Sequence, residues 1–174
     1  MIAYHWLQLD MTSENGSEAP WMVGEERRLP AGYRLKLCEV GYHWSPTPFD
    51  GLTYAPGPML TRVEVSRSKH DATPWEAKGV SRRRKLLIAV NVERELREFA
   101  CDCAERALMR ERKAGREPDA RSWAAVETAR RFARGEATAG ELDAARDVAR
   151  DVAIVAARAA GAAAWAGAWN AARD

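Results

Sequence analysis

Hydrophobic and polar positions alternate in short stretches over the first ninety residues, which is the pattern of half-buried β-strands. The segments predicted to be strands are residues 3–9, 21–24, 33–38, 59–66 and 84–90. The apolar run 86–90 indicates that the last strand lies inside the sheet. An Asn-Gly pair at residues 15–16 predicts a hairpin between the first two strands. A short helix is predicted at residues 47–54, and the polar residues 67–83 are predicted to form a long loop.

A helical period replaces this alternation near residue 91. Two helices are predicted at residues 92–113 and 118–135, and a third begins at the capping box formed by Thr138 and Glu141. Asn91 is expected to cap the first of them. Its buried stripe is predicted to consist of Val92, Leu96, Phe99, Cys103 and Ala107.

The composition changes at the same place. Seven of the eight prolines lie in the first ninety residues, whereas 22 of the last 55 residues are alanine, the best helix former. The prediction is therefore an α+β chain. A small mixed or antiparallel sheet at residues 1–90 is followed by an Ala-rich antiparallel helical segment at residues 91–174, which packs on the sheet domain or on a partner.

Several classes of protein are excluded by composition. A hydrophobic content of 47% excludes wholesale disorder, and no apolar run approaches the eighteen residues that a membrane span needs. The first residues do not read as a secretion signal, and three cysteines indicate a reducing, cytoplasmic setting.

The potential zinc ligands lack the close pairing of a structural site, so neither a metal nor another cofactor is expected. They are Cys38, Cys101, Cys103, His5, His43 and His70. A nucleophilic role for Cys38 was weighed against a role as a small buried residue, and the second is expected.

Three blocks of sequence resemble a family of uncharacterised phage and prophage proteins. They are LCEVGYHWSPTPFDGLTYAPGPMLTRVEVS from residue 37, RRRKLLIAV from residue 82 and LREFACDCAERAL from residue 96, with an alanine- and arginine-rich tail behind them. The resemblance covers about residues 1–110 and implies a phage context, in the cytoplasm of a bacterial host. It brings no established reaction. The entry to the first long helix, Asn91-Val92-Glu93, departs from what the resemblance would lead us to expect.

A second, weaker resemblance concerns the block around His43. The succession of a strand, a short helix that ends at Tyr54 and a further strand is similar to ADP-ribosyltransferase folds. That resemblance implies an enzyme in which His43, Tyr54 and Glu64 are the site residues, with His5 and Glu93 as alternatives for the histidine and the carboxylate. The competing interpretation treats the aromatic residues as core and has His43 hydrogen-bonded to a backbone carbonyl.

The run Arg82, Arg83, Arg84 and Lys85 is the sharpest charge feature of a chain whose net charge is only +2. With Trp75 it would make loop 67–85 a contact for nucleic acid or for an acidic protein face. The alternative is a solubilising loop that guards the edge of the next strand.

The C-terminal helix offers a seam of small residues that ends in Trp165 and Trp169, which suggests contact with another subunit or a target. The leading hypothesis is a non-catalytic phage or prophage accessory protein that binds a host or phage protein complex, plausibly to antagonise a bacterial defence system. The alternatives are the ADP-ribosyltransferase-like enzyme and the nucleic-acid-binding protein. No membrane contact is expected, and a homo-oligomer through the last helix remains open.

Overall fold

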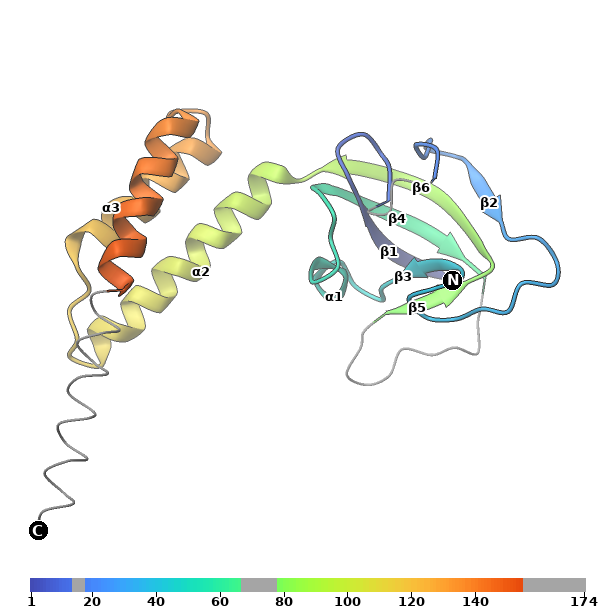
Figure 1. The fold of residues 1–174 in the computed structure, drawn as a ribbon, viewed down its shortest axis with the longest axis horizontal. Coiled ribbons are helices and arrows are strands. Elements are labelled where there is room, and N and C mark those ends of the chain that lie inside the picture. The colour runs from blue at the N-terminus through green and yellow to red at the C-terminus, as the bar shows by residue number, and fades with distance from the viewer. Residues whose placement is uncertain (14–17, 67–77, 155–174) are drawn as a thin grey trace, which may run out of the picture. The chain divides into compact units, whose positions relative to one another are not determined.

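The chain folds into two compact units, Met1–Glu93 and Arg94–Asp174, and the computed structural model describes residues 1–13, 18–66 and 78–154 (Figure 1). The strands and one short helix lie in the first unit, and the long helices lie in the second. The predicted α+β class is confirmed, and every strand pair is antiparallel.

The N-terminal unit is built on a four-stranded sheet with the strand order β1-β4-β6-β2. Its strands are β1 (Ile2–Leu7), β2 (Glu26–Arg28), β4 (Met59–Val65) and β6 (Arg83–Asn91). A separate pair consists of β3 (Tyr42–Trp44) and β5 (Gly79–Ser81). The short helix α1 (Pro48–Leu52) begins at Thr47, whose side chain accepts the Asp50 N–H, as the sequence predicts.

Three of the sequence predictions for this unit are wrong. Residues 33–38 do not form a strand, because the chain turns back on itself at a bridge between Lys36 and Val40 and Cys38 has a left-handed φ of 65°. Residues 21–24 are not a strand either, and Trp21 is buried in the core cluster. The predicted loop 67–83 contains the strand β5, which was missed because a three-residue strand has no period to detect.

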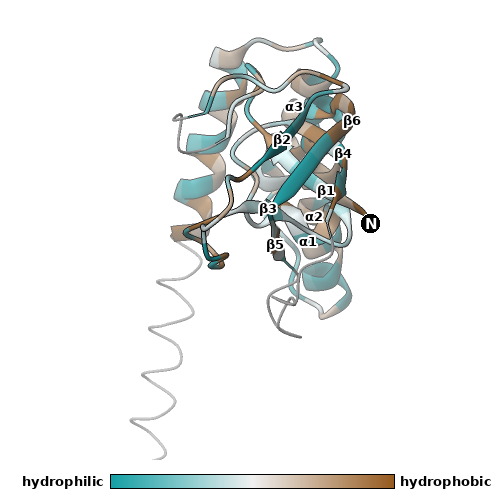
Figure 2. Cartoon of the chain, turned by 90° about the vertical axis from the view of Figure 1, so that its right-hand side faces the viewer, coloured by the Kyte–Doolittle hydropathy of each residue, from teal (hydrophilic) through white to brown (hydrophobic). Residues whose placement is uncertain are grey.

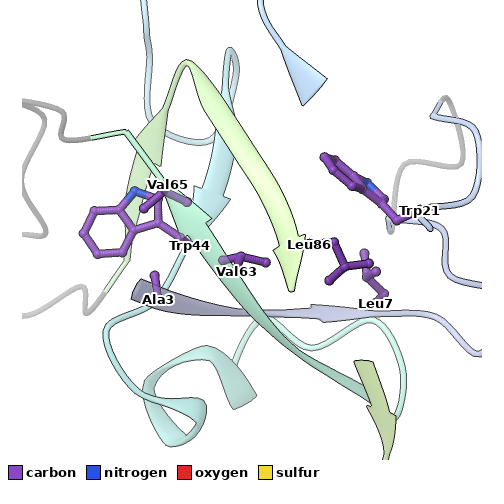
Figure 3. Close-up of a cluster of buried hydrophobic side chains, with 7 residues drawn as sticks. All are labelled: Ala3, Leu7, Trp21, Trp44, Val63, Val65 and Leu86. Carbon is purple, nitrogen blue, oxygen red and sulfur yellow. The ribbon is translucent and has the colours of Figure 1, made fainter. Parts of the chain in front are cut away.

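One face of the sheet, here called the inner face, carries the core. The cluster consists of Ala3, Leu7, Trp21, Trp44, Val63, Val65 and Leu86 (Figure 3). In β4 the buried residues Thr61, Val63 and Val65 alternate with residues on the opposite face, which here is called the outer face. Each fully buried Val or Leu in such a core contributes about 1.5–3 kcal/mol.

Strand β6 lies inside the sheet as predicted, but only part of it is covered. Its first three residues are charged and pair with β2, whereas residues 86–90 are apolar (Figure 2). A register shift at Arg62 and Val63 of β4 interrupts the pairing, and beyond it Ile88 and Val90 are 47% and 50% exposed. The apolar run therefore identified a strand correctly without identifying which of its residues are buried.

The second unit contains α2 (Glu93–Lys113), α3 (Ala120–Ala133) and a further helix over residues 139–154. The predicted capping box is confirmed, because Thr138 N–H donates to Glu141 Oε2 at 2.7 Å and Glu141 N–H donates to Thr138 Oγ1 at 3.2 Å. The predicted stripe of α2 is wrong: Cys101 is buried and Cys103 is exposed. The prediction started the helical repeat at Val92 and therefore assigned the buried positions to the wrong face of the helix.

No helix in the described ranges 1–13, 18–66 and 78–154 is long and apolar enough to cross a membrane.

Candidate functional site

A cavity of about 560 Å³ opens in the N-terminal unit on the inner side of the sheet. Its volume lies in the range of small-molecule sites. Charged and titratable side chains in its wall are His5, Glu18, Tyr33, Cys38, Glu39, Tyr42, His43, Tyr54, Lys78 and Arg84. The strand pair β3–β5 supplies His43 and Trp44, and the main sheet supplies His5 and Arg84.

A close approach between β5 and Trp44 shapes this cavity. A Cβ atom placed on Gly79 would lie 2.3 Å from Trp44 Cζ2, so only glycine lets the strand pass against the indole. Gly41 has a φ of 129°, and a Cβ atom there would lie 2.2 Å from Val80. These two glycines set the position of the β3–β5 pair.

Two buried polar atoms in the cavity wall have no hydrogen-bond partner among the described residues. They are Nε2 of His5 and Nε1 of Trp44. Buried polar groups are nearly always paired, because an unpaired one costs about 1–3 kcal/mol. Trp123 Nε1 in the second unit is the third such atom in the described ranges, so two of the three lie at this one cavity.

Arg84 is a buried cation at the same place. Its residue surface is 2% exposed, and its Nη1 donates to the His43 carbonyl oxygen at 3.1 Å. Its guanidinium carbon lies 4.3 Å from the centre of the Trp21 ring and 5.3 Å from that of Tyr42. Burial lowers the pKa of Arg84 to about 10, with the charge of Glu18 acting in the opposite direction. The side chain still carries its charge at neutral pH.

Glu18 is the carboxylate nearest to Arg84, and it is shared. Its Oε2 accepts from Trp21 Nε1 at 3.0 Å and lies 3.7 Å from Arg27 Nη1, but 4.0 Å from Arg84 Nη2. The Arg27 guanidinium also lies over the Trp21 ring, at 4.1 Å. One carboxylate thus faces two guanidinium groups.

The two histidines of the cavity are held neutral at pH 7. Burial lowers the pKa of His5 well below 6.5, and the charges of Arg84 and His43 lower it further. The pKa of His43 is also lowered, first by burial and then by Arg84 and Lys78, while Glu18 opposes the shift. His43 Nε2 accepts the Cys38 N–H at 2.8 Å, which places the proton of the neutral ring on Nδ1.

These shifts predict that mild acid destabilises the N-terminal unit alone. Below pH 6.5 the unfolded chain binds protons at His5 and His43 that the folded unit excludes. The free energy of unfolding therefore decreases as the pH is lowered. The charged groups that face the two rings are Arg84, Lys78 and Glu18, and the cations add to this effect. Urea titrations at about pH 7.5 and pH 5.5, followed by assigned amide NMR signals, measure each unit separately.

The second unit supplies the control for this experiment, because histidine occurs only at positions 5, 43 and 70. The urea midpoint of the second unit should not move between the two pH values, and that of the first unit should fall at the lower one. Equal shifts in both units would contradict the assignment to these histidines.

The structure brings together two of the three residues of the ADP-ribosyltransferase-like alternative. His43 and Tyr54 line the cavity, and Lys78 Nζ lies 4.1 Å from the centre of the Tyr54 ring. Glu64 does not line it: this residue lies on the outer face of β4 and forms an ion pair with Arg83. His43 Nε2 accepts from a backbone N–H, and within residues 1–13, 18–66 and 78–154 its ring donates to no carbonyl, contrary to the competing prediction.

The basic run does not form the loop that the sequence predicts. Arg83, Arg84 and Lys85 belong to β6, and their side chains alternate between the faces of the sheet. Arg82 donates to the carbonyl oxygens of Pro30 and Tyr33, and Arg83 pairs with Glu26 and Glu64. Together with the burial of Arg84, these contacts engage all three arginines inside the unit, which removes the support for a phosphate-binding loop built from them.

Cys38 is exposed, contrary to the expectation that it is a buried small residue. It lies in the cavity wall, next to His43. The hydrogen bond that joins them comes from the Cys38 backbone N–H and occupies the Nε2 lone pair of His43. The ring nitrogen is therefore not free to accept the thiol proton in this arrangement.

A larger cavity, of about 840 Å³, lies inside the second unit. Alanine is the commonest residue in its wall, which is formed by α2, α3 and residues 139–154 and also contains Cys101, Leu142 and Phe132. Small side chains leave the interior of a helix bundle incompletely filled, and the polar residues of this wall are Arg97, Ser122, Asp143 and Arg146. Trp75, Trp165 and Trp169, for which contact with a partner was predicted, lie outside the described residues.

No group of three or more His, Cys, Asp or Glu side chains in the described part of the chain is placed to hold a metal ion.

The sequence did not lead us to predict that Arg84 is buried apart from the other basic residues, or that His5 lines the cavity together with His43. Arg84 was grouped with its charged neighbours, although an arginine two positions before Leu86 in an apolar strand shares the face of that residue. That alternation was the available signal. No sequence signal places Glu18 beside Trp21 and Arg84.

No family model, no curated protein and no solved structure matches the chain at a significant level. The function must therefore be argued from the residues of the cavity themselves.

Proposed function

We propose that the N-terminal unit binds a small organic ligand in the cavity between the inner face of the sheet and the β3–β5 pair. The observation that carries this proposal is the coincidence of a cavity of about 560 Å³ with two unpaired buried polar atoms, His5 Nε2 and Trp44 Nε1. A ligand that supplies hydrogen-bond partners to both atoms would remove the cost of leaving them unpaired.

The aromatic residues of the wall support an organic ligand. Tyr42, Trp44 and Tyr54 provide flat apolar surfaces, while Arg84, Lys78 and the two histidines provide polar contacts. Small-molecule sites combine mostly apolar walls with a few fixed polar groups in this way. Binding is the part of the function that this geometry supports.

Cysteine reactivity tests the proposal with the full-length protein. Cys38 and Cys103 are both exposed, but only Cys38 lines this cavity. The small-molecule fraction of a bacterial lysate should slow the alkylation of Cys38 by N-ethylmaleimide several-fold and leave the rate at Cys103 unchanged. Peptide mass spectrometry measures both rates in the same sample, so consumption of the reagent by the fraction is corrected internally.

A pair of variants provides the control. Val40→Trp adds volume to the cavity wall and should abolish the protection, whereas Val23→Trp places the same side chain at a position that is 61% exposed and outside the wall. If the fraction leaves Cys38 unprotected in the native protein, or protects it equally in Val40→Trp, the proposal is wrong.

A nucleotide is the second candidate, because His43 and Tyr54 of the ADP-ribosyltransferase-like alternative line the same wall. NAD⁺ is therefore included as a separate probe in the alkylation experiment. Transfer of label from NAD⁺ to lysate macromolecules would favour the enzyme, and protection of Cys38 without transfer would favour a binding protein. Action on a phage or host complex stays a prediction of the sequence resemblance.

A further inference from the structure

Building on the proposed function, we infer that the ligand carries an anionic group, a phosphate or a carboxylate, which binds to Arg84 and the two histidines in this cavity. Arg84, His5 and His43 come from two different sheets and meet in one wall. The inference names the chemical class of the ligand and the residues that recognise it.

The first argument is the incomplete compensation of Arg84. A buried guanidinium group usually forms paired hydrogen bonds with a carboxylate. Among the described residues, the Arg84 guanidinium donates a hydrogen bond to the His43 carbonyl oxygen, and the Glu18 carboxylate oxygen lies 4.0 Å away. An anion in the cavity would supply the missing paired acceptor.

The second argument is that the carboxylates of the wall are already engaged. Glu18 accepts from Trp21 Nε1 and faces Arg27, and Glu39 pairs with Lys36 at 2.5 Å. Glu39 is thus directed toward a cation that does not line the cavity, and Glu18 is divided between Arg27, which lies outside the wall, and Arg84. Arg84 is therefore the buried cation of the wall whose described carboxylate contact is long and shared, and a further anion would complete its compensation.

The third argument is the state of the histidines. His5 Nε2 is unpaired, and a neutral ring that carries its proton on this nitrogen would donate to an anionic oxygen. The pKa of both rings is lowered by burial and by the nearby Arg84 charge. A bound anion would act in the opposite direction, so binding should take up protons and strengthen below neutral pH.

Titrations with simple anions test the inference. Sodium pyrophosphate represents the phosphate class, sodium citrate the carboxylate class, and adenosine is a neutral probe. Proton–carbon NMR follows the ring signals of His5 and His43 in the intact protein, and calorimetry in two buffers of different ionisation enthalpy measures proton uptake. We expect one of the two anions to shift both rings and to bind with proton uptake, and adenosine alone to leave both rings unshifted.

Arg84→Met is the decisive variant, because it keeps much of the apolar stem and removes the charge. It should weaken anion binding by roughly 10- to 100-fold, the size expected for a charge-assisted hydrogen bond. Arg83→Met is the matched control, since Arg83 neighbours Arg84 but pairs with Glu26 and Glu64 and does not line the cavity. If Arg84→Met fails to fold, His5→Phe replaces it and should also weaken binding.

The outcomes separate this inference from the proposed function. Anion binding that is lost in Arg84→Met and kept in Arg83→Met supports the inference. Equal binding by both variants, or protection of Cys38 by the lysate fraction while neither anion binds, overturns it and leaves the ligand cavity standing. If neither the fraction nor any anion acts at the cavity, both the inference and the proposed function are wrong.

Discussion

Arg84→Glu is expected to lower the free energy of unfolding of the N-terminal unit by about 3–5 kcal/mol, as when a buried ionic contact is broken. Arg84 is 2% exposed, and the new carboxylate would lie among Trp21, Tyr42 and Glu18 with no cation that it alone can pair with. Urea titration followed by assigned amide signals of β4 and β6 measures the change, and the signals of the second unit should not move.

Arg82→Glu is the comparison that gives this result its meaning. Arg82 donates to two backbone carbonyls at the surface, so its reversal should cost only about 1–2 kcal/mol. If the two reversals had similar small effects, the run 82–85 would behave as the solvated basic patch that the sequence suggested. That result would contradict the conclusion that Arg84 is buried.

Trp21→Ala is expected to have the second large effect, a loss of about 3–5 kcal/mol. Trp21 is 2% exposed and packs edge-on against Tyr42, with ring centres 5.7 Å apart. Its removal opens a cavity beneath two guanidinium groups, those of Arg27 and Arg84, and leaves both without the ring they lie over. The same amide signals report the loss.

Trp21→Phe separates the ring from its N–H group. This variant keeps an aromatic face but loses the hydrogen bond from Nε1 to Glu18 Oε2. Loss of that hydrogen bond should lower the free energy of unfolding by about 1–2 kcal/mol. Trp21→Ala within about 1 kcal/mol of the native protein would show that Trp21 is not part of the core.

The elements that the sequence predicted well are those whose signal is local. The strand at 59–66 has a period of two and an apolar strand at 84–90 has β-branched residues, and both appear as β4 and β6 within one residue at each end. The caps at Thr47 and Thr138 were also predicted, because a cap is a hydrogen bond between neighbours in the chain. The strands of only three residues were missed because so short a segment has no period to detect.

The candidate site could be predicted only in part. His43 and Tyr54 were singled out from the sequence, and both line the cavity. Glu18 and Arg84 were not assigned to it, although Arg84 was named in the basic run. The partners of the arginines depend on which strands pair, and the spacing of charges along the chain does not contain that information.

By itself, the sequence determined the α+β class, the change from strands to helices near residue 91 and the caps at Thr47 and Thr138. These features depend on contacts between residues a few positions apart. Only the tertiary structure decided that three adjacent arginines have different environments, and that His5, His43 and Arg84 meet in one wall. Strand pairing joins residues that are dozens of positions apart. Burial then determines which charged side chains stay hydrated and which need a hydrogen-bonded or charged partner.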